Sequence, residues 1–386
     1  MIPSYPLSNR DASRLLYYNR GEIVDKNFKD LPALIPSGAM MIFNNSRVVP
    51  ARLFFNRESG AIIEIFCLEP IDPADYTLSF ASTSSVIWRV IVGNKKRWKG
   101  DKISMYNPQK HNLISNIQLS AQYVKDEGDT CIVCFQWHNN LSFAEVLDIC
   151  GKIPIPPYLH RESEIIDIER YQTIYANLRG SVAAPTAGLH FSPKVISSLK
   201  DKGIKLSEIT LHVGAGTFKP VKEEMVMHHA MHHESFTVSL SFLEQLLLHK
   251  GEVICVGTTS VRCVESLYYF GLMCCLGREP KQLSQWEAYR DALPVTREES
   301  LEQLITYLKK QQCNTFSAKT QIMIVPSFVF RWTSGMITNF HQPKSTLLLL
   351  IAAFMGDEWK RCYHHALQHG YRFLSYGDSS LLCPSA

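Results

Sequence analysis

The order of hydrophobic and polar residues divides the chain into three stretches. Between about Arg52 and about Asn140, short runs such as AIIEIFCLEP, SVIWRVIVG and CIVCFQWH are rich in β-branched and aromatic residues and are separated by turn residues. Such runs are typical of a small antiparallel sheet or barrel. Before and after them, strand-like runs alternate with helical ones, as in α/β folds. We therefore predict an α/β domain with a mixed sheet and flanking helices (residues 1–55 and 145–386), interrupted by a small antiparallel β-barrel (residues 56–144).

Local signals place several helices in the second half of the chain. Ser192 and Pro193 are typical of a helix start, and Ser241 with Glu244 forms a capping-box pattern for the next helix. The strand-like runs EVICV and MITNF each lead through a polar loop into an apolar helical run, VRCVESLYYF and LLLLIAAFM. The segment of about residues 271–312 has mixed charge and is predicted to be a helical insertion.

Composition limits the class of protein. With 46% hydrophobic residues among 386, the chain can bury a sizeable core. The longest apolar run, from Leu347 to Met355, is far shorter than the roughly 20 residues that cross a bilayer, so it predicts a buried helix. The start MIPSYPLSNRDASRLL lacks the apolar run of a secretory signal, and the odd number of cysteines, eleven, favours reduced thiols. We expect a cytoplasmic protein without membrane contact, and a monomer.

The net charge of +4 permits a polyanionic partner without requiring one. The segment GNKKRWKGDK is more informative, because it places five cationic side chains around Trp98. Basic residues beside an aromatic ring suit a nucleic-acid backbone with a stacking surface. The alternative for this charge run alone is a solvated hairpin tip.

Four loops rich in small and polar residues are candidates for a ligand site: GSVAAPTAGLHF, LHVGAGTF, VGTTSVR and TNFHQPKST. Ligands of open α/β sheets bind where the carboxyl ends of strands meet the starts of helices. Three of the four loops follow a predicted strand or lead into a helix, so we expect the loops to converge on one pocket. Free amides at a helix start favour a phosphate or a carboxylate.

The loop VGTTSVR combines close backbone approach with hydrogen-bonding groups. Gly257 allows the approach, Thr258, Thr259 and Ser260 supply hydroxyls, and Arg262 can form a bidentate contact with a carboxylate or phosphate. An amino-acid group would fit this set. The alternative for the hydroxyls is that they cap the helix and satisfy its backbone donors.

Candidate bases lie in the other loops. His190 follows Thr186 in TAGLHF, His212 precedes the two glycines Gly214 and Gly216 in LHVGAGTF, and His341 lies in TNFHQPKST. TNFHQPKST also contains an amide, an ammonium and two hydroxyls, supplied by Asn339, Lys344, Ser345 and Thr346. His341 could act as a general base and Lys344 could pair with a phosphate, while Ser345 or Thr346 caps the helix. For His190 a buried, satisfied side chain is the alternative, and for the two glycines a tight turn.

The segment MHHAMHH suggests a metal site, because histidines four residues apart on a helix can share one ion. The four residues are His228, His229, His232 and His233. The segment lacks the glutamate of an HExxH motif and has no partner carboxylate or cysteine at ligand spacing. We expect no metal, and a metal-dependent hydrolase remains a less favoured alternative.

Taken together, strings along nearly the whole chain resemble those of the S-adenosylmethionine:tRNA ribosyltransferase-isomerases of queuosine biosynthesis. The strings are YPLSNRDASRLL, FNNSRVVPARL, IPIPPYLHR, ERYQTIYA, the four loops above, and GYRFLSYGDSSLL. The resemblance implies an α/β domain with a β-barrel insert. It also implies transfer of the ribosyl part of S-adenosylmethionine onto 7-aminomethyl-7-deazaguanine in tRNA, which gives epoxyqueuosine, adenine and methionine.

That chemistry needs a base for the sugar carbon beside the sulfonium, for which His190, His212 and His341 are the candidates. The methionine carboxylate needs amides or a cation, and the tRNA needs cations and aromatic surfaces. The cations expected to contact RNA are Arg10, Arg14, Arg47, Arg52, Lys95, Lys96 and Arg97. For Arg52, pairing with a core carboxylate is the alternative. A paralogue acting on another RNA or base, and a non-catalytic RNA-binding protein, are the competing functions.

Overall fold

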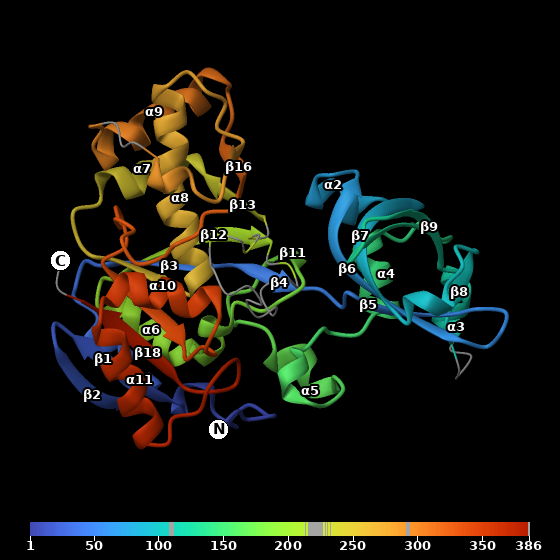
Figure 1. The fold of residues 1–386 in the computed structure, drawn as a ribbon, viewed down its shortest axis with the longest axis horizontal. Coiled ribbons are helices and arrows are strands. Elements are labelled where there is room, and N and C mark those ends of the chain that lie inside the picture. Colours follow the sequence, from blue (N-terminus) through green and yellow to red (C-terminus); the bar gives the residue numbers. More distant parts are fainter. Residues whose placement is uncertain are drawn as a thin grey trace.

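The computed structural model describes residues 1–107, 112–212, 214, 227, 229, 231, 233–290 and 294–384 (Figure 1). Figure 1 shows an α/β domain on one side and a barrel on the other, joined by extended connections, one of which carries helix α5 (Ile165–Arg170). The predicted fold class, a mixed sheet with flanking helices and an inserted antiparallel barrel, is confirmed.

The main sheet has ten strands in the part of the chain that is described. Its strands, in spatial order, are β15 (Gln282–Leu283), β16 (Thr315–Thr320), β13 (Glu234–Ser239), β12 (Lys205–His212), β3 (Met40–Asn44), β14 (Val253–Val256), β17 (Gly335–Asn339), β18 (Ser379–Cys383), β1 (Arg14–Asn19) and β2 (Glu22–Asn27). The four central strands, β12, β3, β14 and β17, are parallel to their neighbours within that group. Strand β18 runs antiparallel to β17, so the sheet is mixed.

Helices cover both faces of this sheet. Strand β3 explains why, because its residues alternate between two cores: Met40 and Ile42 contact one core, and Met41 and Phe43 contact the other. A continuous apolar run is expected for a strand buried on both faces. The first core includes α7 (Leu240–Leu248), α8 (Thr258–Cys275), α9 (Arg297–Lys310), α10 (Thr346–Met355) and α11 (Glu358–Gln368), and the second includes α1 (Leu31–Leu34) and α6 (Pro193–Asp201).

Helix α6 begins at the predicted Ser192 cap, whose hydroxyl accepts from the backbone N–H of Val195. The capping box predicted at Ser241 and Glu244 is wrong. Helix α7 begins two residues earlier, because the hydroxyl of Ser239 accepts from the backbone N–H of Phe242. The segment 271–312 contains the end of α8, the short strand β15 and all of α9, so part of it joins the sheet.

Six antiparallel strands close the barrel in the order β10-β7-β6-β5-β8-β9. They are β5 (Arg52–Asn56), β6 (Ile62–Asp72), β7 (Ser85–Gly93), β8 (Ile103–Met105), β9 (Ser120–Asp126) and β10 (Cys131–Gln136), with α2 (Tyr76–Ala81), α3 (Asn112–Ile117) and α4 (Phe143–Cys150) beside them. Alternate residues of β7 point into the barrel core. Strand β5 spans the predicted boundary at residue 55 and pairs with barrel strands throughout.

Trp98 belongs to the barrel core and is not a surface ring. It is 6% exposed, its indole N–H donates to the carbonyl of Asp101, and its ring packs edge-on against Tyr123. The expected stacking surface for RNA at this position is therefore wrong. The hydrophobic effect explains the difference, because burying a large ring in the core is worth more than exposing it beside four or five charges.

Two further observations complete the fold. Strands β4 (Ser46–Val48) and β11 (Leu178–Ser181) form a separate parallel pair.

The predicted buried helix over the apolar run is confirmed as α10, whose Leu350, Ile351 and Phe354 are buried. Among the described residues, no helix has both the length and the apolar character needed to cross a membrane.

Candidate active site

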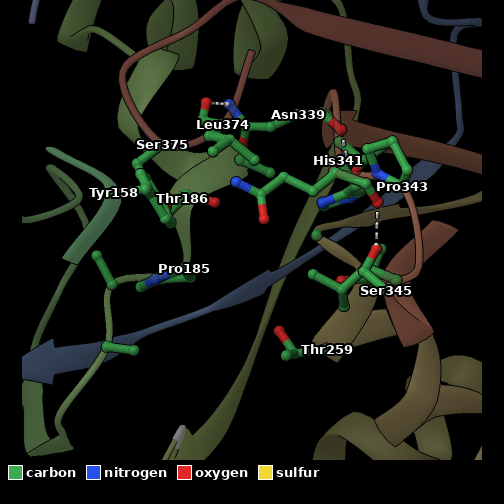
Figure 2. A pocket seen from close by; sticks show the side chains of 18 residues that line it. Tyr158, Pro185, Thr186, Thr259, Asn339, His341, Pro343, Ser345, Leu374 and Ser375 are labelled. Atoms are coloured by element: carbon green, nitrogen blue, oxygen red, sulfur yellow. Dashed lines mark hydrogen bonds between the residues drawn. The ribbon is translucent and has the colours of Figure 1, made fainter. Parts of the chain in front are cut away.

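Three of the four predicted loops meet in one pocket (Figure 2), which contains about 910 Å³ of space not filled by atoms, part of it open to solvent. Of the predicted site residues, those that line it are Thr186, Thr258, Thr259, Asn339, His341 and Ser345. In Figure 2, Tyr158 and Pro185 lie on one side of the hollow and His341 and Ser345 lie on the other. The expected convergence of these loops is therefore observed for these six residues.

Strand pairing brings two of these loops together. Strands β14 and β17 are parallel neighbours, so their carboxyl ends lie at the same edge of the sheet. Strand β14 leads through Gly257 into α8, and β17 leads through the loop containing His341 into α10. Gly257 has φ +91°, a conformation that favours glycine, and its N–H donates to the carbonyl of Ile337 in β17.

The start of α8 offers the pocket free backbone donors. Gly257 is the residue before the helix, and no side chain of the described residues caps this end. The hydroxyl of Ser260 does not compensate, because it donates to the carbonyl of Val256 at 2.7 Å. Uncapped N–H groups and the helix dipole together favour an anionic ligand group. The start of α10 differs, because the hydroxyl of Ser345 accepts from the backbone N–H of Leu348.

Among the three candidate bases, His341 lines this pocket. Its Nε2 lies 2.9 Å from Oγ1 of Thr338, and its backbone N–H donates to the hydroxyl oxygen of Tyr363. Burial lowers the pKa of His341 to about 4. The imidazole is therefore neutral near neutral pH, which leaves it able to accept a proton.

His190 lies behind the pocket and has both ring nitrogens engaged. Nδ2 of Asn339 donates to the carbonyl of Leu374, which fixes the orientation of this amide. The same Nδ2 lies 3.0 Å from Nε2 of His190 and donates to it. Nδ1 of His190 is then the protonated nitrogen and donates to the hydroxyl of Ser13 at 2.8 Å. His190 is the satisfied buried histidine that the sequence left open as the alternative.

His212 connects the two domains. Its ring stacks on Tyr76 of barrel helix α2 with centroids 3.8 Å apart, and its Nδ1 donates to the carbonyl of Gly180 at 3.0 Å. A Cβ atom at Gly180 would lie 2.2 Å from that same Nδ1, so only glycine fits there. His212 does not line the pocket.

Arg262 also lies outside the pocket lining, in contrast to its predicted contact with a ligand carboxylate. It is 3% exposed, and its guanidinium forms an ion pair with Glu234 at 2.7 Å and donates to the carbonyl of Ile322. The position of Arg262 along the helix explains why it does not reach the pocket. Arg262 is the fifth residue of α8, and its side chain contacts β13 instead of the helix start.

The remaining predicted cofactor residues that the structure describes do not line the pocket. The hydroxyl of Ser260 donates to the backbone carbonyl of Val256, Lys344 is exposed, and Thr346 is the first residue of α10. Gly214 does not line the pocket, and Gly216 lies outside the described residues. For these residues a ligand contact stays a prediction.

Three of the expected RNA-contacting cations already have carboxylate partners. Arg52 pairs with Glu64 at 2.6 Å, as its alternative interpretation anticipated, Lys95 pairs with Asp126, and Arg14 lies 3.7 Å from Asp25. Lys96 and Arg97 are exposed at the barrel end, and Arg47 is the exposed central residue of β4. Arg10 and Arg47 line one surface cleft of the α/β domain.

In the histidine-rich segment, His228 and His232 lie outside the described residues. Over the described ranges, one group has ligand geometry: Asp25, His365 and His369, whose ligand atoms lie within 4.8 Å of one another. Tyr371 donates to the Asp25 carboxylate. None of these three residues lines the pocket.

The structure adds pocket residues that the sequence did not single out: Tyr158, Gln342, Leu374 and Ser375. The oxygens of Tyr158 and Ser375 lie 2.5 Å apart, joining segments more than 200 residues apart in the chain. Both residues lie in strings that carry the family resemblance, IPIPPYLHR and GYRFLSYGDSSLL. That resemblance was the available signal for these two residues.

The sequence matches one family of proteins along nearly its whole length. The family model described as queuosine biosynthesis protein matches residues 1–382, so this chain belongs to that family. Its relatives include S-adenosylmethionine:tRNA ribosyltransferase-isomerases. The one from Polynucleobacter asymbioticus is 34% identical and covers 99% of this chain and 94% of its own, and the one from Francisella tularensis is 35% identical and covers 99% and 95%. The resemblance noted in the sequence is confirmed.

A solved structure also matches this chain. The S-adenosylmethionine tRNA ribosyltransferase from Thermotoga maritima is 26% identical, with 98% of this chain and 95% of that chain covered and a TM-score of 0.46.

The three buried histidines predict how stability depends on pH. Burial lowers the pKa of His190, His212 and His341 to about 4 each, whereas an unfolded histidine has a pKa of about 6.5. Below pH 6.5 the unfolded chain therefore binds protons that the folded chain excludes. The free energy of unfolding should fall as the pH drops from 6.5 towards 4, by about 2 kcal/mol per histidine at pH 5.

Urea unfolding at pH 7 and pH 5 measures this effect, and His212→Asn provides the matched comparison because an asparagine amide can still donate to the Gly180 carbonyl. The variant should lose about a third of the pH dependence. An equal pH dependence in the variant and the parent protein would contradict the assignment for His212.

Proposed function

We propose that this protein transfers and isomerises the ribosyl moiety of S-adenosylmethionine onto 7-aminomethyl-7-deazaguanine in tRNA. Epoxyqueuosine forms, and adenine and methionine leave. The observation that carries the proposal is the pocket at the carboxyl ends of β14 and β17, which combines an uncapped helix start with a neutral buried histidine. Membership of the queuosine biosynthesis family supports the same reaction.

The start of α8 is suited to the methionine carboxylate of S-adenosylmethionine. Within the described ranges, its backbone N–H groups have no side-chain cap, and Thr258 and Thr259 line the pocket beside them. A carboxylate at a helix start gains from both the N–H donors and the dipole. The backbone therefore supplies what Arg262 was expected to supply, since Arg262 already neutralises Glu234.

His341 is suited to be the base. The reaction begins with loss of a proton from the sugar carbon beside the sulfonium, whose positive charge makes this carbon acidic. A base must be unprotonated when substrate binds, and the lowered pKa of His341, about 4, keeps its imidazole neutral. His190 is a poorer base, because both of its ring nitrogens already take part in hydrogen bonds.

Tyr158 is suited to donate to the departing adenine. Burial raises the pKa of its phenol to about 12, so the group keeps its proton. It lies across the pocket from His341 (Figure 2), which allows proton removal and leaving-group protonation on different sides of the sugar. Every role in this scheme is filled by a protein group, and none requires a metal.

Since tRNA is the acceptor, we place the protein in the cytoplasm. We also treat the single chain as the active unit.

The direct test incubates the purified protein with S-adenosylmethionine and tRNA that carries 7-aminomethyl-7-deazaguanine. Free adenine, free methionine and epoxyqueuosine in the tRNA digest should appear in equal amounts by mass spectrometry. If cofactor and tRNA bind but neither adenine nor epoxyqueuosine forms, the proposal fails, and the paralogue acting on another RNA or base becomes the better assignment.

The role of His341 predicts a selective loss of turnover. His341→Asn should lower kcat by about 10²- to 10⁴-fold, the usual contribution of a general base, while KM for S-adenosylmethionine changes little. His249→Asn is the matched control, because His249 is also buried but lies outside the pocket. The control should keep parental kcat. A His341→Asn variant with parental kcat would assign the base to another group.

A further inference from the structure

A small cavity next to the pocket contains three arginines that the proposed reaction does not use. It is lined by Arg10, Ser13, Arg170, His190, Arg372 and Ser375, among others, and contains about 300 Å³ of space not filled by atoms, part of it open to solvent. Ser375 lines both this cavity and the main pocket. His190 accepts from Asn339, which lines the main pocket. One wall of side chains therefore separates the two cavities.

The charges of two of these arginines are not balanced. Arg372 pairs with Asp378 at 2.6 Å, but Arg10 and Arg170 form no ion pair within the described part of the chain. Arg10 donates to the backbone carbonyls of Glu169 and Gln172, and Arg170 donates to those of Leu7 and Ser8. These bonds hold the N-terminal segment against α5 without neutralising either guanidinium.

Both side chains retain unused donors and are costly to keep together. Nε of Arg170 is buried and has no hydrogen-bond partner among the described residues. Burial and the nearby Arg170 guanidinium both lower the pKa of Arg10. Two like charges with unused donors at one cavity are stabilised when an anion binds between them.

The surroundings indicate which anion. Arg10 and Arg170 line not only the small cavity but also the wide surface cleft outside it. This cleft is lined by two more cations, Arg47 and Lys194, against the carboxylates of Asp11 and Glu169. Asp11 is engaged, since its carboxylate accepts from the hydroxyl of Ser192. The exposed side chains of Ile168 and Ile174, which are 55% and 39% exposed, also line the cleft.

We propose that Arg10 and Arg170 bind one backbone phosphate of the tRNA where this small cavity opens onto the surface cleft, next to the nucleotide that reacts in the main pocket. An extended polyanion fits this arrangement better than a free cofactor carboxylate, because the two arginines open onto the basic cleft and lie behind the wall of the main pocket. The exposed isoleucines offer apolar surface to unstacked bases. The inference rests on the proposed function for its RNA partner.

The test measures tRNA binding without S-adenosylmethionine, across a series of salt concentrations. Arg10→Gln and Arg170→Gln should each weaken binding about tenfold and reduce the slope of log K against log salt by about one, since each removes a phosphate contact. Arg361→Gln is the matched control. Arg361 also donates to a backbone carbonyl, that of Gly21, but its charge is paired with Glu358. The control should keep the parental slope.

Lysine variants separate phosphate binding from a purely structural role. Arg10→Lys and Arg170→Lys lose the paired carbonyl bonds but keep the charge, so they should retain most of the salt slope that the glutamine variants lose. If all four variants lower the unfolding midpoint and none changes the slope, the arginines only hold the N-terminal segment. That result would overturn the proposal, and so would an increase in KM for S-adenosylmethionine at unchanged tRNA affinity.

These measurements distinguish a failure of the phosphate site from a failure of the proposed reaction. A reduced slope in the glutamine variants supports the phosphate site even if the parental protein forms no epoxyqueuosine. An unchanged slope in an enzyme that does form epoxyqueuosine overturns the phosphate site and leaves the proposed reaction intact.

Discussion

The parallel pairing of β14 with β17 is the constraint on which the site depends. It aligns the carboxyl ends of the two strands, so Gly257 and His341 reach the same pocket although they are separated by 84 positions in the numbering of the chain. The hydrogen bond from Gly257 to Ile337 holds the two loops together at that edge. Because β14 also pairs with β3, which is buried on both faces, the strand ends are fixed by the core of the domain. A rigid core therefore positions a site made of loops.

The three buried histidines have different surroundings and different roles in the structure. His341 faces the pocket, His190 supports the wall through Ser13 and Asn339, and His212 joins the sheet to the barrel through Tyr76. All three have lowered pKa values for the same reason, the loss of water around the imidazole. A lowered pKa alone does not identify the base here. Access to the pocket is the ground on which we propose His341, because a base must reach the proton that it removes.

Much of the fold could be predicted from local sequence. The periodicity of the apolar runs indicated both the mixed sheet and the barrel, and the cap at Ser192 was identified correctly. The site was predicted in part. Small and polar residues before a helix revealed Thr258 and His341, but local sequence does not tell which side of a helix faces the pocket, as Arg262 shows. Tyr158 and Ser375 could not be found that way, since only the folded chain brings them together. Trp98 was misplaced because charge density in its neighbours outweighed its own hydrophobicity.

The central claim is that the pocket beside β14 and β17 holds the ribosyl donor against His341. A crystal structure of the protein with S-adenosylmethionine, without tRNA, tests it most directly. The account predicts the methionine carboxylate at the start of α8 and the sugar carbon beside the sulfonium within reach of the His341 imidazole. Electron density for the cofactor beside His190 or His212, with the pocket empty, would contradict it.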